Sequence, residues 1–437
     1  MKMRLYKAAL AVLVLLMFGG LVDRGIVPAV THRKSDASSS NDFAGPWIGA
    51  WMWRHGQNPY DVALTSVVGR EFLKYDRPVV LIYPATACML LAPFTFLSWN
   101  TANFLWSVLC VIGVLAVALV LLKLGSLKSE DIRSWLLVAI IFSLTPLRAG
   151  VLVENPAIVS IALCLSAVYL ASLEKDIAAG IVLAMATALK PNLCIWILLF
   201  YLLRRRWRLS LSFVISGVVI TSLTLARVPL SPSRLLANYM QNIQETLSSG
   251  GSNAFIAGTH LGLLDLQVVL YPMVGRPASM LAYLIFAIGL GMWFWAVQRN
   301  PSCPETLALS SLLALGFLPI YHRAYDVGIL TLSLCWALAR AGDVSRLLRR
   351  TTLILMLLFL IPERLFGAFA IAYLPATVRS TPWWYMIVLP HSVWILLLLN
   401  IALLCALVQL RHGDEGSRSD YNREPIPAAL SLRVAGL

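Results

Sequence analysis

Apolar runs of bilayer length recur along most of this chain, and they restrict it to folds that embed many helices. A transmembrane helix needs about 20 apolar residues, and such runs begin at 8–22 and continue as a series from 101 to 410. Hydrophobic residues make up 59% of the 437 residues and charged residues only 13%, which leaves too little polar surface for a water-soluble globule. The sequence therefore predicts an all-α polytopic membrane protein.

The lengths of the runs predict about 12 transmembrane helices. We place them at 8–22, 101–122, 134–150, 156–172, 177–189, 191–203, 209–227, 278–298, 305–321, 325–340, 351–366 and 387–410. The stretch 79–97 is broken by Pro84 and Pro93, so we expect it to re-enter the membrane from the outer side rather than cross it. The first run could be a signal peptide, but no small-x-small cleavage site follows it, and we interpret it as an anchor.

Basic residues indicate the orientation. Lys2, Arg4 and Lys7 precede the first run, and Lys and Arg gather in cytoplasmic loops of membrane proteins, so we expect the amino terminus in the cytoplasm. A net charge of +14 can also indicate nucleic-acid binding, but the basic residues here stand in short loops between apolar runs. The chain is thus predicted to be a multi-pass protein of the cell membrane with no nucleic-acid partner.

The predicted organisation has four parts. Residues 1–22 form the first transmembrane helix, and 23–78 form an outer loop with short interfacial helices around 47–54 and 61–74. The transmembrane core spans 79–410 and includes a long outer loop at 228–277, and a charged cytoplasmic tail at 411–437 is expected to be disordered. The seven cysteines form no CxxC pair, so we expect buried thiols rather than a metal site.

Polar residues beside the apolar runs collect at the predicted outer ends of helices. Asp42 lies in the first outer loop, and the others lie in tight turns at Glu154-Asn155, at Lys190-Pro191-Asn192 and at 321–326. Ionisable groups at membrane depth are costly and are usually kept for a substrate path or for each other. We therefore expect these turns to converge on one outer pocket, in which the Asp42 carboxylate could accept a proton.

Several short motifs occur in a fixed order along this part of the chain. They are Asp42, Gly56-x-x-Pro59-Tyr60-Asp61, Tyr83-Pro84, Glu154-Asn155, Ala188-Leu189-Lys190-Pro191, Arg204-Arg205-Arg206-Trp207 and the turn from His322 to Asp326. In this order they resemble glycosyltransferase family 87, whose members are membrane enzymes of the GT-C superfamily. The resemblance runs from about residue 40 to residue 330 and implies a GT-C-like helical bundle. The family often has a Gly-Gln pair in the turn that is Val153-Glu154-Asn155-Pro156 in this chain.

The resemblance implies a reaction as well as a fold. It implies inverting transfer of a hexose, mannose-like, from a polyprenyl-phosphate-linked donor to a lipid or cell-envelope glycan acceptor on the outer face. Asp42 would be the general base, and cations would stabilise the departing phosphate. The expected site residues are Asp42 and His322 for catalysis, Lys190 and Arg323 for the donor phosphate, and Tyr60, Tyr83, Glu154, Asn155 and Asp326 for further substrate contacts. No Asp-x-Asp pair occurs on the predicted outer side, so we expect neither a metal nor another cofactor.

Each candidate residue also has a structural interpretation. Asp42 could cap the helix that follows it, and Lys190 could extend to the interface. His322 could join two helices through a backbone carbonyl, and Arg323 with Asp326 could form a salt bridge or a cap at a helix start.

The partner of Glu154 and the function of the whole protein also have to be considered. Glu154 should find a charge partner in Arg148 or Lys190, because an isolated buried carboxylate is costly. A lipid-linked sugar flippase or transporter is the main functional alternative, although it would need polar residues at the bilayer midplane and towards the inside. A non-catalytic scaffold for cell-envelope assembly is the other functional alternative.

Overall fold

The computed structural model describes residues 2–30, 41–75, 78–248, 262–274, 278–339, 345–362, 365, 369 and 372–410. Helices joined by turns and loops make up this part of the chain, which contains one isolated β-bridge, between Leu263 and Arg323, and no strand. The predicted all-α class is confirmed. The predicted cytoplasmic tail at 411–437 lies outside the described residues.

Long apolar helices show that the protein belongs in a membrane. Five helices are long and apolar enough to cross a bilayer, and a pair bent by 45°, α7 (Ile132–Ser143) with α8 (Thr145–Leu152), could make a sixth. The five are α1 (Lys2–Gly25), α6 (Trp99–Leu124), α12 (Trp207–Arg227), α15 (Ser279–Arg299) and α21 (His391–Val408). The predicted total of about 12 spans is not confirmed.

Most of the other predicted spans coincide with apolar helices that are too short to cross. With 14 residues, α10 rises about 21 Å, whereas the hydrocarbon core is about 30 Å thick. The breaks follow local chemistry, because Pro191 begins α11 and separates it from α10 at Lys190. The short apolar helices are α9 (Ala157–Ser172), α10 (Asp176–Leu189), α11 (Pro191–Leu203), α16 (Glu305–Gly316) and η2 (Ala324–Thr331) continued by α17 (Leu332–Leu338).

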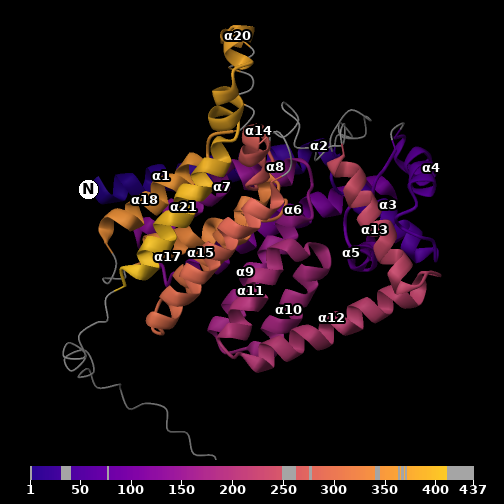
Figure 1. Cartoon of the computed structure of the whole chain (residues 1–437), viewed down its shortest axis with the longest axis horizontal. Helices are drawn as coiled ribbons and strands as arrows, with labels where there is room; N and C mark the ends of the chain where they lie inside the picture. The colour runs from indigo at the N-terminus through magenta and orange to yellow at the C-terminus, as the bar shows by residue number, and fades with distance from the viewer. Residues whose placement is uncertain are drawn as a thin grey trace, which may run out of the picture.

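The helices pack into an elongated bundle. Figure 1 shows α9, α10 and α11 side by side in the middle and α12 along one edge, where it packs on α10. The close approach of α10 and α12 needs Gly180, because a Cβ there would lie 2.4 Å from the carbonyl oxygen of Leu209. Helices α1, α18 (Arg346–Leu358) and α21 gather at one end, while α20 (Ala376–Arg379) projects from the bundle.

The predicted first outer loop contains two helices, α3 (Ala44–Arg54) and α4 (Val62–Leu73), at the places where interfacial helices were predicted. Asp61 caps α4 by accepting hydrogen bonds from the backbone amides of Ala63 and Leu64. In α3 Trp47 is buried rather than exposed at a surface, and the Trp53 indole donates to the Thr224 carbonyl at the end of α12 (3.0 Å). These contacts attach the loop to the bundle. The interfacial placement of both helices stays a prediction.

The stretch 79–97 is not one continuous helix. It forms α5 (Ala85–Leu91), which begins after Pro84, and a 3₁₀ turn η1 (Ala92–Phe96), which contains Pro93. Both breaks fall at Pro84 and Pro93, where they were predicted. Whether this stretch re-enters the membrane stays a prediction.

The described parts of the predicted long outer loop, 228–248 and 262–274, contact the bundle at two places. Helix α13 (Pro232–Leu247) lies beside Tyr60 and Leu81: its Tyr239 ring is 5.4 Å from the Tyr60 ring, and its Asn242 amide donates to the Leu81 carbonyl at 3.1 Å. Before α14 (Gln267–Val274), the Leu264 amide donates to the His322 carbonyl at 2.9 Å, and the Ala324 amide donates to the Gly262 carbonyl at 2.8 Å. The segment 262–266 therefore holds the turn that carries Arg323.

Three short elements complete the described chain. They are α2 (Val27–Val30), α20 and the π-helical turn η3 (Trp384–Val388). Six of the seven cysteines are buried free thiols, as expected, whereas Cys405 is exposed.

Candidate active site

A cavity of about 710 Å³ opens where the segments 41–46 and 80–83, α8, the segment 262–264, the turn at 321–325 and the end of α18 meet. One part of its wall is polar and another is apolar. The polar lining includes Asn41, Asp42, Tyr83, Asn155, Tyr321, Arg323 and Tyr325. The apolar lining includes Val80, Ile82, Pro146, Val327, Phe359 and Ile361. This combination suits a ligand that has a polar head and an apolar chain.

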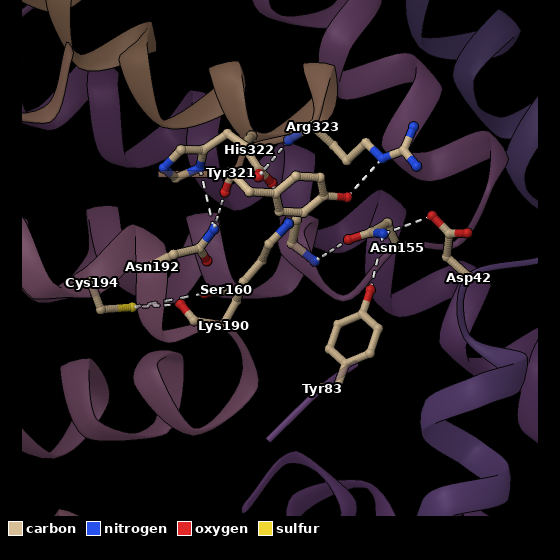
Figure 2. Close-up of polar contacts among 12 residues, drawn as sticks. Asp42, Tyr83, Asn155, Ser160, Lys190, Asn192, Cys194, Tyr321, His322 and Arg323 are labelled. Atoms are coloured by element: carbon tan, nitrogen blue, oxygen red, sulfur yellow. Dashed lines mark hydrogen bonds and ion pairs between the residues drawn. The ribbon is translucent and has the colours of Figure 1, made fainter. Parts of the chain in front are cut away.

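Asp42 is held at the cavity wall by both its backbone and its side chain. Its amide donates to the Val153 carbonyl at 2.7 Å. Its carboxylate accepts a hydrogen bond of 2.7 Å from the side-chain amide of Asn155 (Figure 2). Helix α3 begins at Ala44 without a side-chain cap, so the Asp42 carboxylate does not serve as the cap considered from sequence.

The surroundings of Asp42 change its proton affinity. Burial raises the pKa of its carboxyl above the ordinary value of 3.8, while the Asn155 hydrogen bond and the charges of Arg323 and Lys190 oppose that rise. A carboxylate with a raised pKa is a stronger base than a solvated one. Arg323 lines the same cavity as Asp42, as the predicted convergence requires.

Asn155 is fixed by contacts on both ends of its side-chain amide. The Nδ2 group donates to Asp42 and to the Tyr83 hydroxyl (3.1 Å), and Oδ1 accepts from the backbone amide of Ala157 (2.8 Å) at the start of α9. The preceding residue, Glu154, adopts a left-handed backbone conformation with φ of +58°. That conformation is uncommon for a side chain other than glycine, and it turns the chain from α8 into α9.

Glu154 is fully buried and does not line the cavity. Its carboxylate accepts hydrogen bonds from the side-chain amide of Asn41 (2.8 Å) and from the Ser107 hydroxyl. Neutral donors therefore reach both of its oxygens. Arg148, one of the two expected partners, lies between α8 and α1 with its guanidinium 3.9 Å from the Met17 sulfur.

Lys190, His322 and Asp326 form a buried cluster beside the cavity. The Lys190 ammonium lies 2.5 Å from Asp326 Oδ1, and His322 Nδ1 lies 3.3 Å from Asp326 Oδ2. The same Oδ2 accepts from the backbone amide of Arg323 at 3.1 Å. His322 is fully buried and stacks on Phe317 with ring centroids 4.1 Å apart. The cluster thus fixes the turn from which Arg323 extends.

Arg323 is the predicted phosphate-binding cation that lines the cavity. Its Nε donates to the Tyr321 hydroxyl at 2.8 Å, so the side chain lies along the tyrosine ring (Figure 2). Lys190 and His322 are not among the lining residues, although the Lys190 ammonium lies 4.7 Å from the centre of the Tyr325 ring. Lys190 therefore adjoins the cavity through Tyr325.

Tyr60 and Tyr83 are joined to each other. The Tyr60 hydroxyl donates to the Tyr83 carbonyl at 3.0 Å, and Tyr83 extends its own hydroxyl to Asn155. Tyr83 lines the cavity and Tyr60 does not. Tyr60 thus supports the segment that presents Tyr83.

The sequence-based candidates fall into three groups. Four line the cavity, three form the adjoining buried cluster, and two hold residues that line it. The residues that line the cavity are Asp42, Tyr83, Asn155 and Arg323. The adjoining cluster consists of Lys190, His322 and Asp326. The residues that hold others in the wall are Tyr60 and Glu154.

The sequence analysis missed two tyrosines and one asparagine that line the cavity, Tyr321, Tyr325 and Asn41. A signal for one of the tyrosines is present, because Tyr321 stands two residues before Arg323, whose backbone is extended with φ of −103° and ψ of 159°, whereas Tyr325 already belongs to η2. Alternate residues of extended backbone face the same side. No comparable signal marks Asn41.

No group of three or more His, Cys, Asp or Glu side chains that could hold a metal ion occurs within the described ranges. The expectation of a metal-independent reaction stays a prediction.

Comparison with known proteins identifies the family. Residues 81–320, more than half of the chain, match the sequence model of glycosyltransferase family 87. The matched region contains Tyr83, Asn155 and Lys190, whereas Asp42 and Arg323 lie outside it. No curated protein and no solved structure matches the chain. From the family match, together with the membrane-length helices, we conclude that this chain belongs to glycosyltransferase family 87.

Proposed function

We propose that this family 87 glycosyltransferase moves a hexose from a polyprenyl-phosphate-linked donor to a hydroxyl of a lipid or glycan acceptor. Mannose is the first candidate for the hexose, on the basis of the family resemblance. The observation that carries the proposal is that one cavity is lined by the Asp42 carboxylate, the Arg323 guanidinium and an apolar wall. These are the groups needed for a proton, a phosphate and an isoprenoid chain, respectively.

The proposed reaction is a single displacement. The acceptor oxygen attacks C1 of the hexose on the face opposite the phosphate, and the bond from C1 to the phosphate oxygen breaks. The electron pair of that bond leaves with the phosphate, and the hydroxyl proton passes to the Asp42 carboxylate. The products are a glycoside with inverted configuration, polyprenyl phosphate and a protonated Asp42 that returns its proton to water.

Arg323 is the proposed contact for the phosphate. A guanidinium can donate two hydrogen bonds to phosphate oxygens, and these bonds strengthen as negative charge develops on the leaving group. Lys190 adds positive charge nearby but is paired with Asp326. We assign His322 and Asp326 mainly to holding the Arg323 turn, because both are fully buried.

The proposed location is the cell membrane, with the cavity open on the outer side. The support is the positive-inside pattern of the loops, which gives the cytoplasmic side the basic clusters. A cysteine placed at Ser231, at the exposed start of α13, tests this orientation. In intact cells it should react with a membrane-impermeant maleimide, and labelling only after cell lysis would reverse the orientation.

A transfer assay tests the proposed function. The purified protein in detergent is supplied with a short-chain polyprenyl-phosphate mannose carrying radiolabelled mannose and with a membrane lipid extract as acceptor. The proposal predicts a new labelled glycoside and free polyprenyl phosphate. A flippase would instead move intact donor across a vesicle membrane without breaking the bond to C1. Transport of intact donor without a new glycoside would therefore overturn the proposal.

A further inference from the structure

We propose that Glu154 is a positioning residue that holds Asp42 in place through Asn41. This inference rests on the proposed function, because it concerns the placement of the proposed base. It assigns to Glu154 a role inside the wall of the site rather than contact with a substrate.

Two adjacent residues of the outer loop bind two adjacent residues of the turn before α9. Asn41 donates to the Glu154 carboxylate at 2.8 Å, and Asp42 accepts from Asn155 at 2.7 Å. Between these side-chain contacts, the Asp42 amide donates to the Val153 carbonyl at 2.7 Å. The loop and the turn are thus joined at three consecutive points, with the proposed base at one of them.

The Glu154 carboxylate also fixes which way the Asn41 amide points. The Asn41 Nδ2 group donates to both Glu154 and Asn103 (2.8 Å each), and its Oδ1 accepts from the backbone amide of Phe43 at 2.9 Å. A carboxylate only accepts hydrogen bonds, so it selects this orientation of the amide. The Asp42 backbone is then held between Asn41 and Phe43, both of which are anchored.

Aromatic packing gives the same turn a rigid support. The Trp106 indole donates to the Glu154 carbonyl at 2.9 Å, and the Phe43 ring stacks on Trp106 with centroids 4.6 Å apart and planes 7° apart. Burying a carboxylate is costly, and an apolar residue of similar volume often packs as well. Retaining a buried acid here is therefore better explained by the orientation that it imposes than by stability.

The test compares two substitutions of Glu154. Glu154→Gln keeps an acceptor for Asn41, and its amide can donate to the Ser107 hydroxyl, so kcat should stay near the wild-type value. Glu154→Leu removes the acceptor, and kcat should fall about 10-fold to 100-fold because a displaced base is inefficient. The KM for the short-chain polyprenyl-phosphate mannose should not change. Equal kcat values for the two variants would overturn the proposal.

A control and a second variant separate positioning from folding. Glu305→Leu removes another carboxylate, which accepts from the Tyr201 hydroxyl at 2.6 Å and does not line the cavity, and should leave kcat unchanged. If Glu154→Leu does not fold, Asn41→Ala is the deciding variant, since it breaks the same contact from the residue that lines the cavity. It should lower kcat to a similar extent, and wild-type kcat in a folded Asn41→Ala protein would overturn the proposal.

A double-mutant cycle distinguishes this inference from the proposed function itself. If Glu154 acts through Asp42, Glu154→Leu should cause no further loss of rate in the Asp42→Asn background. A full additional loss there would overturn the positioning role. If Asp42→Asn alone retains the wild-type rate, the assignment of the base fails. If Asp42→Asn is impaired and Glu154→Leu is not, only the positioning role fails.

Discussion

The side-chain amide of Asn155 donates a 2.7 Å hydrogen bond to the Asp42 carboxylate and so joins two segments that are 113 residues apart in the chain. Figure 2 shows this contact beside the Tyr83 hydroxyl, which bonds to the same nitrogen. The bond favours the ionised form of Asp42, because a hydrogen bond donated to a carboxylate stabilises its charge. Asn155 therefore influences both the position and the proton affinity of the proposed base.

The first prediction concerns the pH dependence of Asn155→Ser. A serine can still cap α9 at Ala157 but is too short to reach Asp42. Loss of the hydrogen bond should raise the pKa of Asp42 further, so the acidic limb of the kcat profile should move to higher pH by about one unit. The profile is measured by sugar transfer at saturating donor. A limb at the wild-type position would show that Asn155 does not tune the base.

The second prediction concerns Arg323. Arg323→Ala should weaken binding of a short-chain polyprenyl phosphate by about 10-fold to 100-fold, because a charge-assisted contact to phosphate contributes about 1.5–3 kcal/mol. Arg323→Lys should bind with intermediate affinity, since an ammonium cannot reproduce the paired geometry of a guanidinium. Arg299→Ala is the matched control, because Arg299 is exposed and stands apart from the cavity. Wild-type affinity in Arg323→Ala would remove Arg323 from the phosphate.

The third prediction separates two roles for Lys190. Lys190→Met should lower the free energy of unfolding by about 3 kcal/mol, because it leaves the buried Asp326 carboxylate without its cation. The measurement is denaturant unfolding in detergent, alongside binding of polyprenyl phosphate. Unchanged stability combined with weaker binding would instead place the Lys190 ammonium at the phosphate.

The fourth prediction concerns stability and pH at Asp265, outside the long membrane helices. Burial raises the pKa of Asp265 from 3.8 to about 7. From about pH 4 to pH 7 the unfolded chain has lost this proton while the folded protein retains it, so the free energy of unfolding falls as the pH rises through that window. The stabilisation by the protonated form is complete below this range and absent above it.

Asp265→Asn removes this dependence while keeping an acceptor for the Gln267 amide. The melting temperature of the wild type should fall more than that of the variant between about pH 5 and pH 8. Equal falls for the two proteins would show that Asp265 does not hold its proton in the folded state.

Much of the helical pattern could be predicted from the sequence, because the apolar runs and their proline breaks are local features. Pro191 ends α10 at Lys190, and Pro84 and Pro93 divide the stretch 79–97. The number of crossings could not be predicted in the same way. An apolar run such as that of α16, with only 12 helical residues, is equally compatible with a short helix buried among others, since apolar neighbours can replace lipid.

The residues of the site were easier to predict than their pairing. Polar and ionisable residues next to apolar runs can be recognised in the sequence, and Asp42, Asn155 and Arg323 do line one cavity. Composition does not indicate which partner each group selects. Lys190 pairs with Asp326, and Glu154 is bound by neutral donors from Asn41 and Ser107, because these contacts depend on the tertiary placement of distant turns.

The most direct test of the central claim, that Asp42 is the base for sugar transfer, is the single-turnover rate of Asp42→Asn. The carboxamide keeps the shape of the side chain and an acceptor for Asn155 but cannot take the acceptor's proton at neutral pH. With labelled polyprenyl-phosphate mannose bound before the acceptor is added, the rate should fall at least about 100-fold, and the Kd for the donor should not change. A wild-type rate of transfer in this variant would contradict the assignment.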